Sequence, residues 1–202
     1  MALKDVKKNF LIQVATELFL SRGIENTSIT DIANEADVGE MTIYRYFGKK
    51  QYIVFEVVLA LQNEVGKYFT EMDKVEKGSN KLRVFYISFL KIFNDNPNYY
   101  RFIREFDNLM MIDEKKELNQ YEDGFAYFKN AYLAAYQLGN IDGSVNKIDN
   151  IDLFYYMSTH SLMELCKKLS SENLVLNQDN SIGKVSEINC LIDTFLSMLI
   201  HS

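Results

Sequence analysis

The chain has 202 residues, of which 48% are hydrophobic and 25% charged, and its formal net charge is −6. This composition is typical of a globular protein and excludes an intrinsically disordered chain. One Pro and nine Gly are too few turn-forming residues for a sandwich or barrel of many short strands. The composition therefore favours an all-α fold.

The sequence gives no sign of a membrane or secreted protein. No apolar run approaches the roughly 18 residues of a membrane span, and the first ten residues carry four charged side chains in place of a signal-peptide apolar stretch. Cys166 and Cys190 lie in helical patterns without metal-ligand spacing, so we expect buried, reduced thiols. We expect a cytoplasmic protein with no membrane partner, no bound metal and no cofactor.

The first 50 residues contain a predicted three-helix head. A helix over about 5–21 has apolar residues at steps of four, and Gly23 supplies its C-terminal stop. Ser28-Ile29-Thr30-Asp31 has the form of a capping box and begins a short second helix. A three-residue break at 37–39 precedes a third helix over 40–47, which completes a helix-turn-helix pattern.

The chain after residue 48 is predicted to form a helical bundle. Its Gly, Asn, Asp and Pro residues separate the predicted helices. These helices lie near 49–72, 79–94, 97–110, 114–138, 149–170 and 183–201.

Angular spacing on the helix over 40–47 separates a buried side from an outward side. At about 100° per residue, Ile43 and Phe47 project in nearly the same direction and define the buried side. Arg45 projects in the opposite direction, flanked by Met41 and Thr42. An Arg in the centre of such a face can bond a guanine with two hydrogen bonds, and a Thr can contact a base edge or a thymine methyl.

Phosphate contacts are predicted at the edges of this face. Tyr44 and Tyr46 project to its two sides, where their hydroxyls can reach phosphates. Lys49 and Lys50 begin the next helix, whose free amides and dipole favour an anion. On geometry alone the alternative is a plain helical hairpin whose exposed side happens to carry Arg and Tyr.

These residues carry a family resemblance. Residues 27–33 and 38–50 closely resemble the TetR family of bacterial transcriptional regulators. The family pattern is T-[ST]-[VI]-x-x-I-A followed by V-S-x-x-T-[LI]-Y-x-[YH]-F-x-[SN]-K. The resemblance covers about the first 60 residues and implies a helix-turn-helix DNA-binding domain over 1–60 and a helical ligand-binding and dimerisation domain over 61–202.

The resemblance also implies particular DNA contacts. It implies that Thr27 or Ser28, Tyr46 and Lys50 touch phosphates, whereas Met41, Thr42, Tyr44 and Arg45 face the bases. The expected DNA-binding residues are Thr27, Ser28, Met41, Thr42, Tyr44, Arg45, Tyr46, Lys49 and Lys50.

Three positions depart from the family pattern. Asp37 stands where the family often has Gly, at a position of left-handed backbone that Asp tolerates. Gly39 replaces a common capping Ser, and Gly is also accepted there. Glu40 replaces a Lys or small polar residue. Its carboxylate either supplies a favourable charge at the helix start or accepts a hydrogen bond from a cytosine amine.

The last two predicted helices carry apolar stripes wider than one neighbouring helix can cover. The alternatives are an intramolecular bundle and a dimer interface. Resemblance to the family, whose last two helices commonly form a four-helix interface, favours a homodimer on a two-fold symmetric DNA site. The expected interface residues are Phe154, Leu162, Leu165, Ile188, Ile192, Phe195 and Leu199.

Aromatic residues are concentrated after residue 50, where 22 of the 27 Tyr and Phe lie. An apolar cavity with scattered hydroxyls is a usual composition for a ligand site. The acidic balance favours a neutral or cationic lipophilic effector. The expected pocket residues are Phe89, Phe93, Tyr99, Phe102, Phe106, Met110, Tyr121, Phe125, Phe128 and Tyr132.

We therefore expect a transcriptional repressor that a small effector releases from operator DNA. One alternative is a helical ligand- or protein-binding module that does not recognise DNA. Another is a metal-dependent helical enzyme, because His160 and Glu164 are four residues apart on one predicted helix. No H-E-x-x-H or E-x-x-H run and no nucleophile motif accompanies them, so no catalytic residue and no enzyme activity is expected.

Overall fold

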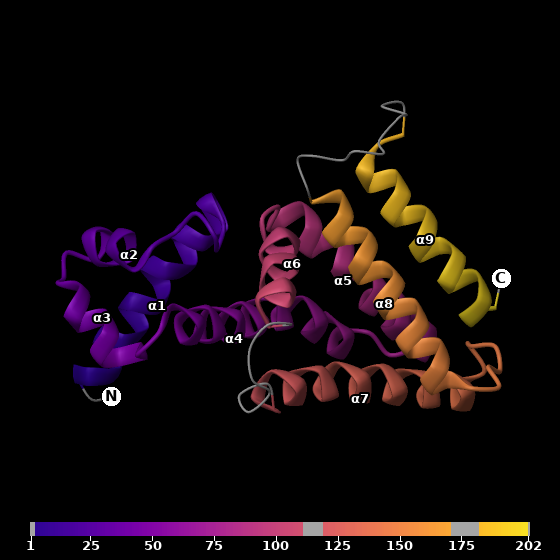
Figure 1. Ribbon diagram of the computed structural model, residues 1–202. Helices are drawn as coiled ribbons and strands as arrows, with labels where there is room; N and C mark the ends of the chain where they lie inside the picture. The colour runs from indigo at the N-terminus through magenta and orange to yellow at the C-terminus, as the bar shows by residue number, and fades with distance from the viewer. Residues whose placement is uncertain (1–2, 111–118, 171–181, 202) are drawn as a thin grey trace. The chain divides into compact units, whose positions relative to one another are not determined.

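The computed structural model describes residues 3–110, 119–170 and 182–201 (Figure 1). Within these ranges the secondary structure is helical, with one isolated antiparallel bridge between Val145 and Ile200. The elements are α1 (Leu3–Arg22), α2 (Ile29–Glu35), α3 (Glu40–Phe47), α4 (Lys50–Phe69), the 3-10 helix η1 (Thr70–Lys74), α5 (Gly78–Asp95), α6 (Tyr99–Met110), α7 (Asn119–Asp142), α8 (Ile151–Leu169) and α9 (Lys184–Leu199).

The chain forms two compact units. The first contains the described residues of Met1–Glu64 and Arg101–Glu117, and the second contains those of Val65–Tyr100 and Leu118–Ser202. The single boundary expected after residue 60 does not separate these units, because most of α6 packs with the helix-turn-helix. Phe102 on α6 contacts Phe19 on α1, with ring centroids 6.4 Å apart.

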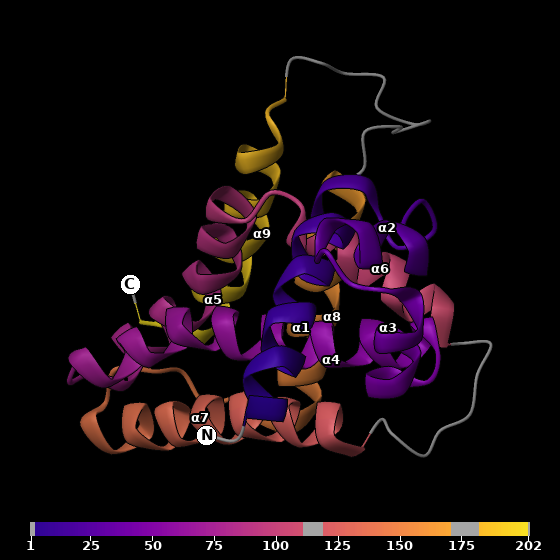
Figure 2. The ribbon, with the colours of Figure 1, turned by 90° about the vertical axis from the view of Figure 1, so that its left-hand side faces the viewer.

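The first unit, which we call the head, has the predicted helix order α1, α2, α3 (Figure 2). The capping box is confirmed, since Ser28 Oγ accepts from the Asp31 amide at 3.0 Å and Asp31 accepts from the Ser28 amide at 2.7 Å. Asp37 adopts a φ of +49°, so the left-handed position expected at the turn is also confirmed. Buried apolar side chains such as Leu11 and Ile32 fill the space between these helices.

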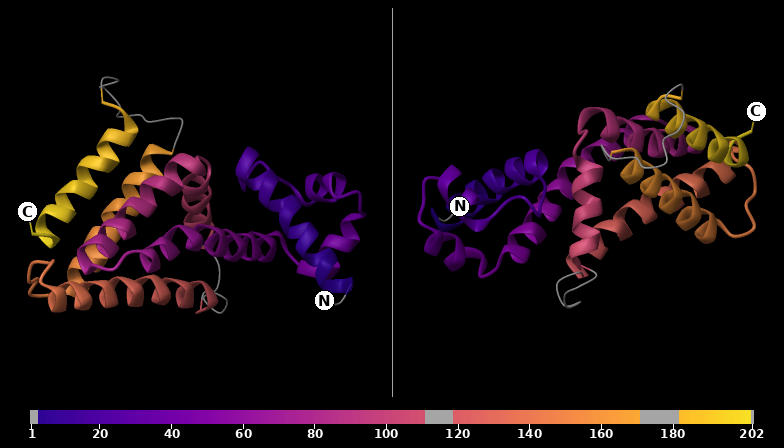
Figure 3. Two further views of the ribbon diagram at one scale, coloured as in Figure 1. Left: turned by 180° about the vertical axis from the view of Figure 1, so that it is seen from behind. Right: turned by 45° about the horizontal axis from the view of Figure 1, so that its top comes forward.

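The second unit, which we call the body, is arranged around α5, which packs against α7, α8 and α9 (Figure 3). The sequence predicted a helix end at residue 138, whereas α7 continues to Asp142. The reason is a close approach of backbones: a Cβ on Gly78 would lie 2.1 Å from the Gly139 nitrogen. Gly78 therefore allows the start of α5 to touch α7. A Cβ on Gly139 would lie 2.4 Å from the Val145 side chain, so Gly139 makes room for Val145 and does not end the helix.

The apolar stripes of α8 and α9 face the interior of the body. Phe154, Leu162, Ile188, Ile192, Phe195 and Leu199 are each at most 6% exposed, and Leu165 is half-buried. The expectation that these residues form the dimer interface is therefore wrong for the six buried ones. Their second packing partner is α5 of the same chain, since the Phe195 ring lies 5.9 Å from Tyr86 on α5 and 6.1 Å from Phe154 on α8.

The two cysteines differ in environment. Cys166 is fully buried, and burial raises the pKa of its thiol to about 12. Cys190 is exposed on α9, so the expectation of two buried thiols is wrong for this one. Among the described residues both thiols are free.

No helix in the described ranges has both the length and the apolar character that a membrane crossing requires.

A chain of buried hydroxyl groups links α7, α5 and α8 within the body. Ser158 Oγ donates to the Tyr155 carbonyl at 3.1 Å, so it accepts from the Tyr86 hydroxyl, which lies 2.7 Å away. Tyr86 in turn accepts from the Tyr132 hydroxyl at 3.1 Å. Burial raises the pKa of Tyr86 to about 12, so its phenol is neutral at physiological pH.

Replacement of Tyr86 by Phe is expected to destabilise the body. The substitution removes the acceptor of the fully buried Tyr132 hydroxyl, and an unsatisfied buried hydroxyl costs about 1–3 kcal/mol. The free energy of unfolding, measured by urea denaturation, should fall by that amount. The control is Tyr127→Phe, because the Tyr127 side chain is 55% exposed on α7 and the loss of its hydroxyl should change the free energy of unfolding by no more than about 0.5 kcal/mol. Equal losses in the two variants would contradict the assigned role of the hydroxyl chain.

Candidate nucleic-acid interface

Helix α3 is fixed in the head by two apolar side chains on one of its sides. Ile43 is completely buried and Phe47 is 7% exposed, as the angular spacing predicted. Gly39 precedes the helix in an extended conformation, and Gly48 ends it with a φ of +75°. That positive φ lies in the region that favours Gly, which explains the sharp turn into α4.

The opposite side of α3 is accessible in the head. Met41 is 78% exposed, Tyr44 is 45% exposed and Arg45 is also exposed. The Arg45 guanidinium carbon lies 5.6 Å from the centroid of the Tyr46 ring, which is half-buried together with Thr42. The structure thus brings the five predicted base-facing and flanking residues of this helix onto one accessible surface.

The two lysines that follow α3 differ in their contacts. Lys49 is exposed. Lys50 is half-buried, and its ammonium group donates a hydrogen bond to the carbonyl of Ile24 in the loop between α1 and α2. Burial lowers the pKa of Lys50. Its charge therefore serves a contact inside the head, and Lys49 is the better candidate for a phosphate contact.

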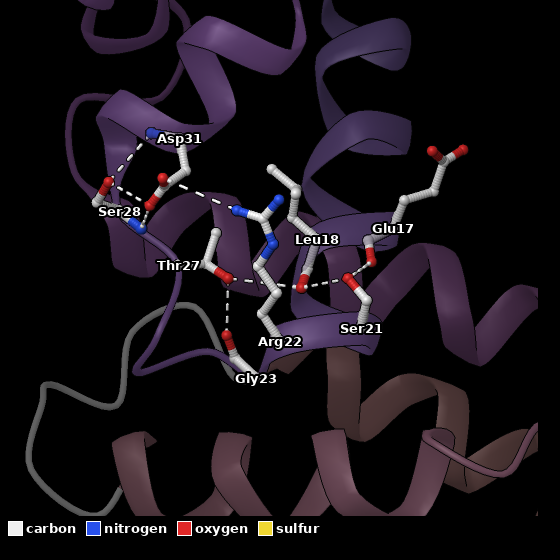
Figure 4. Close-up of polar contacts among 8 residues, drawn as sticks. All are labelled: Glu17, Leu18, Ser21, Arg22, Gly23, Thr27, Ser28 and Asp31. Atoms are coloured by element: carbon white, nitrogen blue, oxygen red, sulfur yellow. Dashed lines mark hydrogen bonds and ion pairs between the residues drawn. The ribbon is translucent and has the colours of Figure 1, made fainter.

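Thr27 does not lie on the surface, so the expected phosphate contact of its side chain is wrong. Its side chain is fully buried, and its hydroxyl donates to the carbonyl of Gly23 at 2.8 Å (Figure 4). A hydroxyl that is enclosed in this way holds the end of α1 in place. The Thr at this position of the pattern therefore has a structural role, because its hydroxyl bonds the Gly23 carbonyl.

Ser28 is exposed, but its hydroxyl is engaged in the capping box. Figure 4 shows the Ser28 hydroxyl and amide directed at the Asp31 carboxylate. These two hydrogen bonds from Ser28 lower the pKa of Asp31. Arg22 adds a longer ion pair to Asp31, with Nη1 and Oδ1 3.9 Å apart. The cap fixes the start of α2, the helix that precedes the turn.

Glu40 is joined to the other helix of the motif. Its Oε1 accepts a hydrogen bond from the Thr30 hydroxyl at 2.6 Å, and both side chains are exposed. The first residue of α3 is thereby linked to the second residue of α2. Neither interpretation of Glu40 from the sequence, as a helix-start charge or as a cytosine contact, included this hydrogen bond, because it joins residues ten positions apart across the turn.

Two residues of α6, which the sequence analysis did not identify, hold the last turn of α1 and the loop that follows it. The Glu105 carboxylate accepts the amide hydrogen of Ile24, and Arg101 donates to the carbonyl of Leu20. A Cβ on Gly23 would lie 3.1 Å from the Glu105 carboxylate oxygens. The only sequence signal is an Arg and a Glu at helical spacing, which does not reveal a contact 81 positions away.

The expected pocket residues do not form one group. Phe102 and Phe106 are buried within the head unit. In the body, Phe89 lies 5.8 Å from Phe69, whose ring is 4.7 Å from that of Phe128. Tyr132 is fully buried beside Phe85, and Phe125 is 38% exposed. Tyr99 is buried and Phe93 is half-buried, and both rings lie beside Tyr100. The side chains of Met110 and Tyr121 lie outside the described residues.

The residues considered for a metal-dependent enzyme do not assemble into a site. Glu164 accepts a hydrogen bond from Lys167 at 2.7 Å, and His160 is exposed beside the ring of Tyr156. Across the described ranges, no three His, Cys, Asp or Glu side chains are grouped closely enough to hold a metal ion.

Comparison with known proteins agrees with the helix-turn-helix assignment. Residues 11–57 match the sequence model of "Bacterial regulatory proteins, tetR family". The chain is 37% identical over 76 residues to the HTH-type transcriptional regulator HbdR of Aromatoleum sp. (strain CIB). This match covers 38% of the present chain and 32% of the relative, so the chain spans about a third of that protein's length.

Solved structures extend the similarity to the whole fold. A TetR transcription regulator from Haloarcula marismortui ATCC 43049 superposes with a TM-score of 0.74 at 13% identity, covering 98% of this chain and 100% of that one. The TetR family transcriptional regulator PfmR from Thermus thermophilus superposes with a TM-score of 0.65 at 16% identity, covering 93% and 97%. Both of these proteins, like HbdR, are named as transcriptional regulators. Residues 11–57 thus match the helix-turn-helix segment of the tetR family of bacterial regulatory proteins, and the solved structures share the helical fold of the whole chain.

Proposed function

We propose that this chain is a DNA-binding transcriptional repressor that occupies a two-fold symmetric operator as a homodimer and leaves it when a small lipophilic effector binds. The observation that carries the proposal is the accessible side of α3. Met41, Tyr44 and Arg45 project outward from a helix whose other side is buried through Ile43 and Phe47. A helix held in this way can enter a major groove without rearranging the head.

The roles within α3 follow from the chemistry of its side chains. Arg45 reads a guanine through two hydrogen bonds, and Thr42 and Met41 contact the neighbouring base edges. Tyr44, Tyr46 and Lys49 bind phosphates on the two sides of the groove, together with the exposed Ser28. Because phosphate contacts carry most of the affinity, binding depends strongly on salt in spite of the acidic body.

The homodimer is proposed to use the outward sides of α8 and α9. Once the predicted stripe is assigned to the interior, exposed apolar side chains remain on these helices: Leu153 at 64%, Met157 at 42% and Met198 at 50%. Tyr156 adds a further exposed ring at 44%. Such a patch favours association with a second copy, and two copies are needed because one short recognition helix offers few base contacts.

Release by an effector is proposed to act through helices that belong to both units. Helix α4 begins in the head at Lys50 and ends in the body at Phe69. Helix α6 begins in the body, and its Arg101 and Glu105 hold the loop that follows α1. A ligand bound among the body aromatics, such as Phe89, Phe128 and Tyr132, would shift these helices and change the spacing of the two α3 helices. A neutral or cationic apolar ligand suits the negative charge of the chain, and the cytoplasm is the compartment where such a repressor would act.

The Arg45→Ala variant is expected to lose base preference. Selection from random duplexes with the unmodified chain should yield an operator. The variant should bind this operator about 5- to 150-fold more weakly than the unmodified chain, because one bidentate base contact contributes about 1–3 kcal/mol. Lys49→Ala should instead weaken binding to all duplexes alike and lower the salt slope by about 1. The measurement is a fluorescence anisotropy titration over a salt series. Arg83→Ala, on an exposed position of the body, is the charge-matched control and should change neither quantity. Uniform losses in both head variants would contradict the role of Arg45.

The Leu153→Asp variant is expected to be monomeric. The substitution places a charge in the centre of the proposed interface, where it would be desolvated on association. Sedimentation equilibrium should give a dimer for the unmodified chain and a monomer for this variant. Ile141→Asp is the matched control, because Ile141 is 83% exposed at the end of α7 and its replacement should leave the dimer intact. A Leu153→Asp variant that remains dimeric would exclude this surface.

Effector binding and operator binding are expected to oppose each other. A thermal-shift screen of neutral and cationic apolar compounds should identify a ligand that raises the melting temperature. Calorimetric titration of that ligand should then show weaker binding in the presence of operator, by the same factor by which the ligand weakens operator binding. Identical ligand affinity with and without operator would disprove the coupling.

A further inference from the structure

The hydrogen bond between Thr30 and Glu40 orients a carboxylate at the start of the recognition helix. The Thr30 hydroxyl donates to Glu40 Oε1 at 2.6 Å, and both residues are exposed on the head. A carboxylate has about four acceptor positions, so one hydrogen bond leaves it able to accept another. The group is therefore held in one orientation and can still accept from a partner outside the chain.

A favourable charge at the helix start does not account for this arrangement. The attraction between a carboxylate and the N-terminal end of a helix needs no bond to a neighbouring helix, and it contributes only about 0.3–1 kcal/mol. Fixing the side chain to Thr30 costs conformational entropy. A negative charge near the groove is also repelled by DNA phosphates, and a hydrogen bond from a base amine would offset that repulsion.

The chemistry of the major groove identifies that contact. The first residues of a recognition helix are the ones that reach base edges. A carboxylate only accepts hydrogen bonds, so it is repelled by O6 and N7 of guanine and by O4 of thymine. Adenine offers its N6 amine beside the acceptor N7, whereas cytosine offers its N4 amine without a neighbouring acceptor in the groove. Cytosine is thus the base that a fixed carboxylate selects.

We propose that Glu40, oriented by Thr30, is a specificity-determining residue that accepts a hydrogen bond from the N4 amine of a cytosine in each operator half-site. The proposal rests on the proposed function, since it requires α3 to lie in the major groove. Glu40 contacts the base, and Thr30 is a positioning residue that acts through Glu40. The pair adds one base to the sequence read by Arg45 and Thr42.

Selection of duplexes from a random pool by the full-length protein tests the proposal. The unmodified chain should enrich a C·G pair at one position of each half-site. Glu40→Ala should lose discrimination at that position alone, by about 5- to 150-fold. Glu40→Gln should move the preference toward adenine, because a carboxamide bonds N6 and N7 together. Thr30→Val keeps the shape of the side chain without its hydroxyl and should lower discrimination at the same position by a smaller factor.

The control variant removes the same charge from elsewhere in the head. Glu35→Gln, at the end of α2, should raise affinity for all duplexes slightly and leave every base preference unchanged. If Glu40→Ala selects the same bases as the unmodified chain, or if no cytosine is enriched, the inference is wrong while DNA recognition stands. If no symmetric site is enriched by the unmodified chain, the proposed function fails together with the inference.

Discussion

Burial of Ile43 and Phe47 on one side of α3 is the constraint on which the proposed DNA-binding surface depends. An eight-residue helix makes few contacts, so two fully enclosed apolar side chains set its rotation about its own axis. That rotation directs Arg45 outward with Met41 and Thr42 beside it, and it places Tyr44 and Tyr46 at the two edges. Loss of either apolar contact would free the helix to turn and would remove the fixed geometry that base reading requires.

The loop between α1 and α2 is held from two other parts of the chain. Both backbone polar groups of Ile24 are engaged, its amide by Glu105 on α6 and its carbonyl by Lys50 on α4. Unpaired buried backbone groups lower the stability of a fold, so Glu105 and Lys50 stabilise the head by satisfying the amide and the carbonyl of Ile24. The head therefore extends beyond the first 60 residues and includes Arg101 and Glu105 of α6.

The proposed DNA contact would be made by a chain whose formal net charge is −6. The first 50 residues contain seven basic and seven acidic side chains, so this segment has no net charge that would attract DNA. Attraction therefore depends on the local arrangement, in which Arg45 and Lys49 are exposed while Lys50 is turned inward. In the proposed complex, base contacts would carry a larger share of the selectivity because few cations near α3 are exposed, and the oriented Glu40 carboxylate would favour discrimination over affinity.

The sequence by itself determined the helical class, the helix-turn-helix, the capping box at Ser28 and the inward side of α3, because each depends on spacing within about ten residues. Only the tertiary structure decided which hydroxyls and charges are free. The Thr27 side chain is buried, Lys50 bonds the Ile24 carbonyl and Glu40 bonds Thr30. The sequence alone revealed none of these three contacts or enclosures. The sequence predicted the apolar stripes of α8 and α9, because periodicity shows which side of a helix is apolar. It does not show what covers that side, which in the structure is α5 of the same chain. The partner of a buried surface is set by long-range packing, and local spacing carries no information about it.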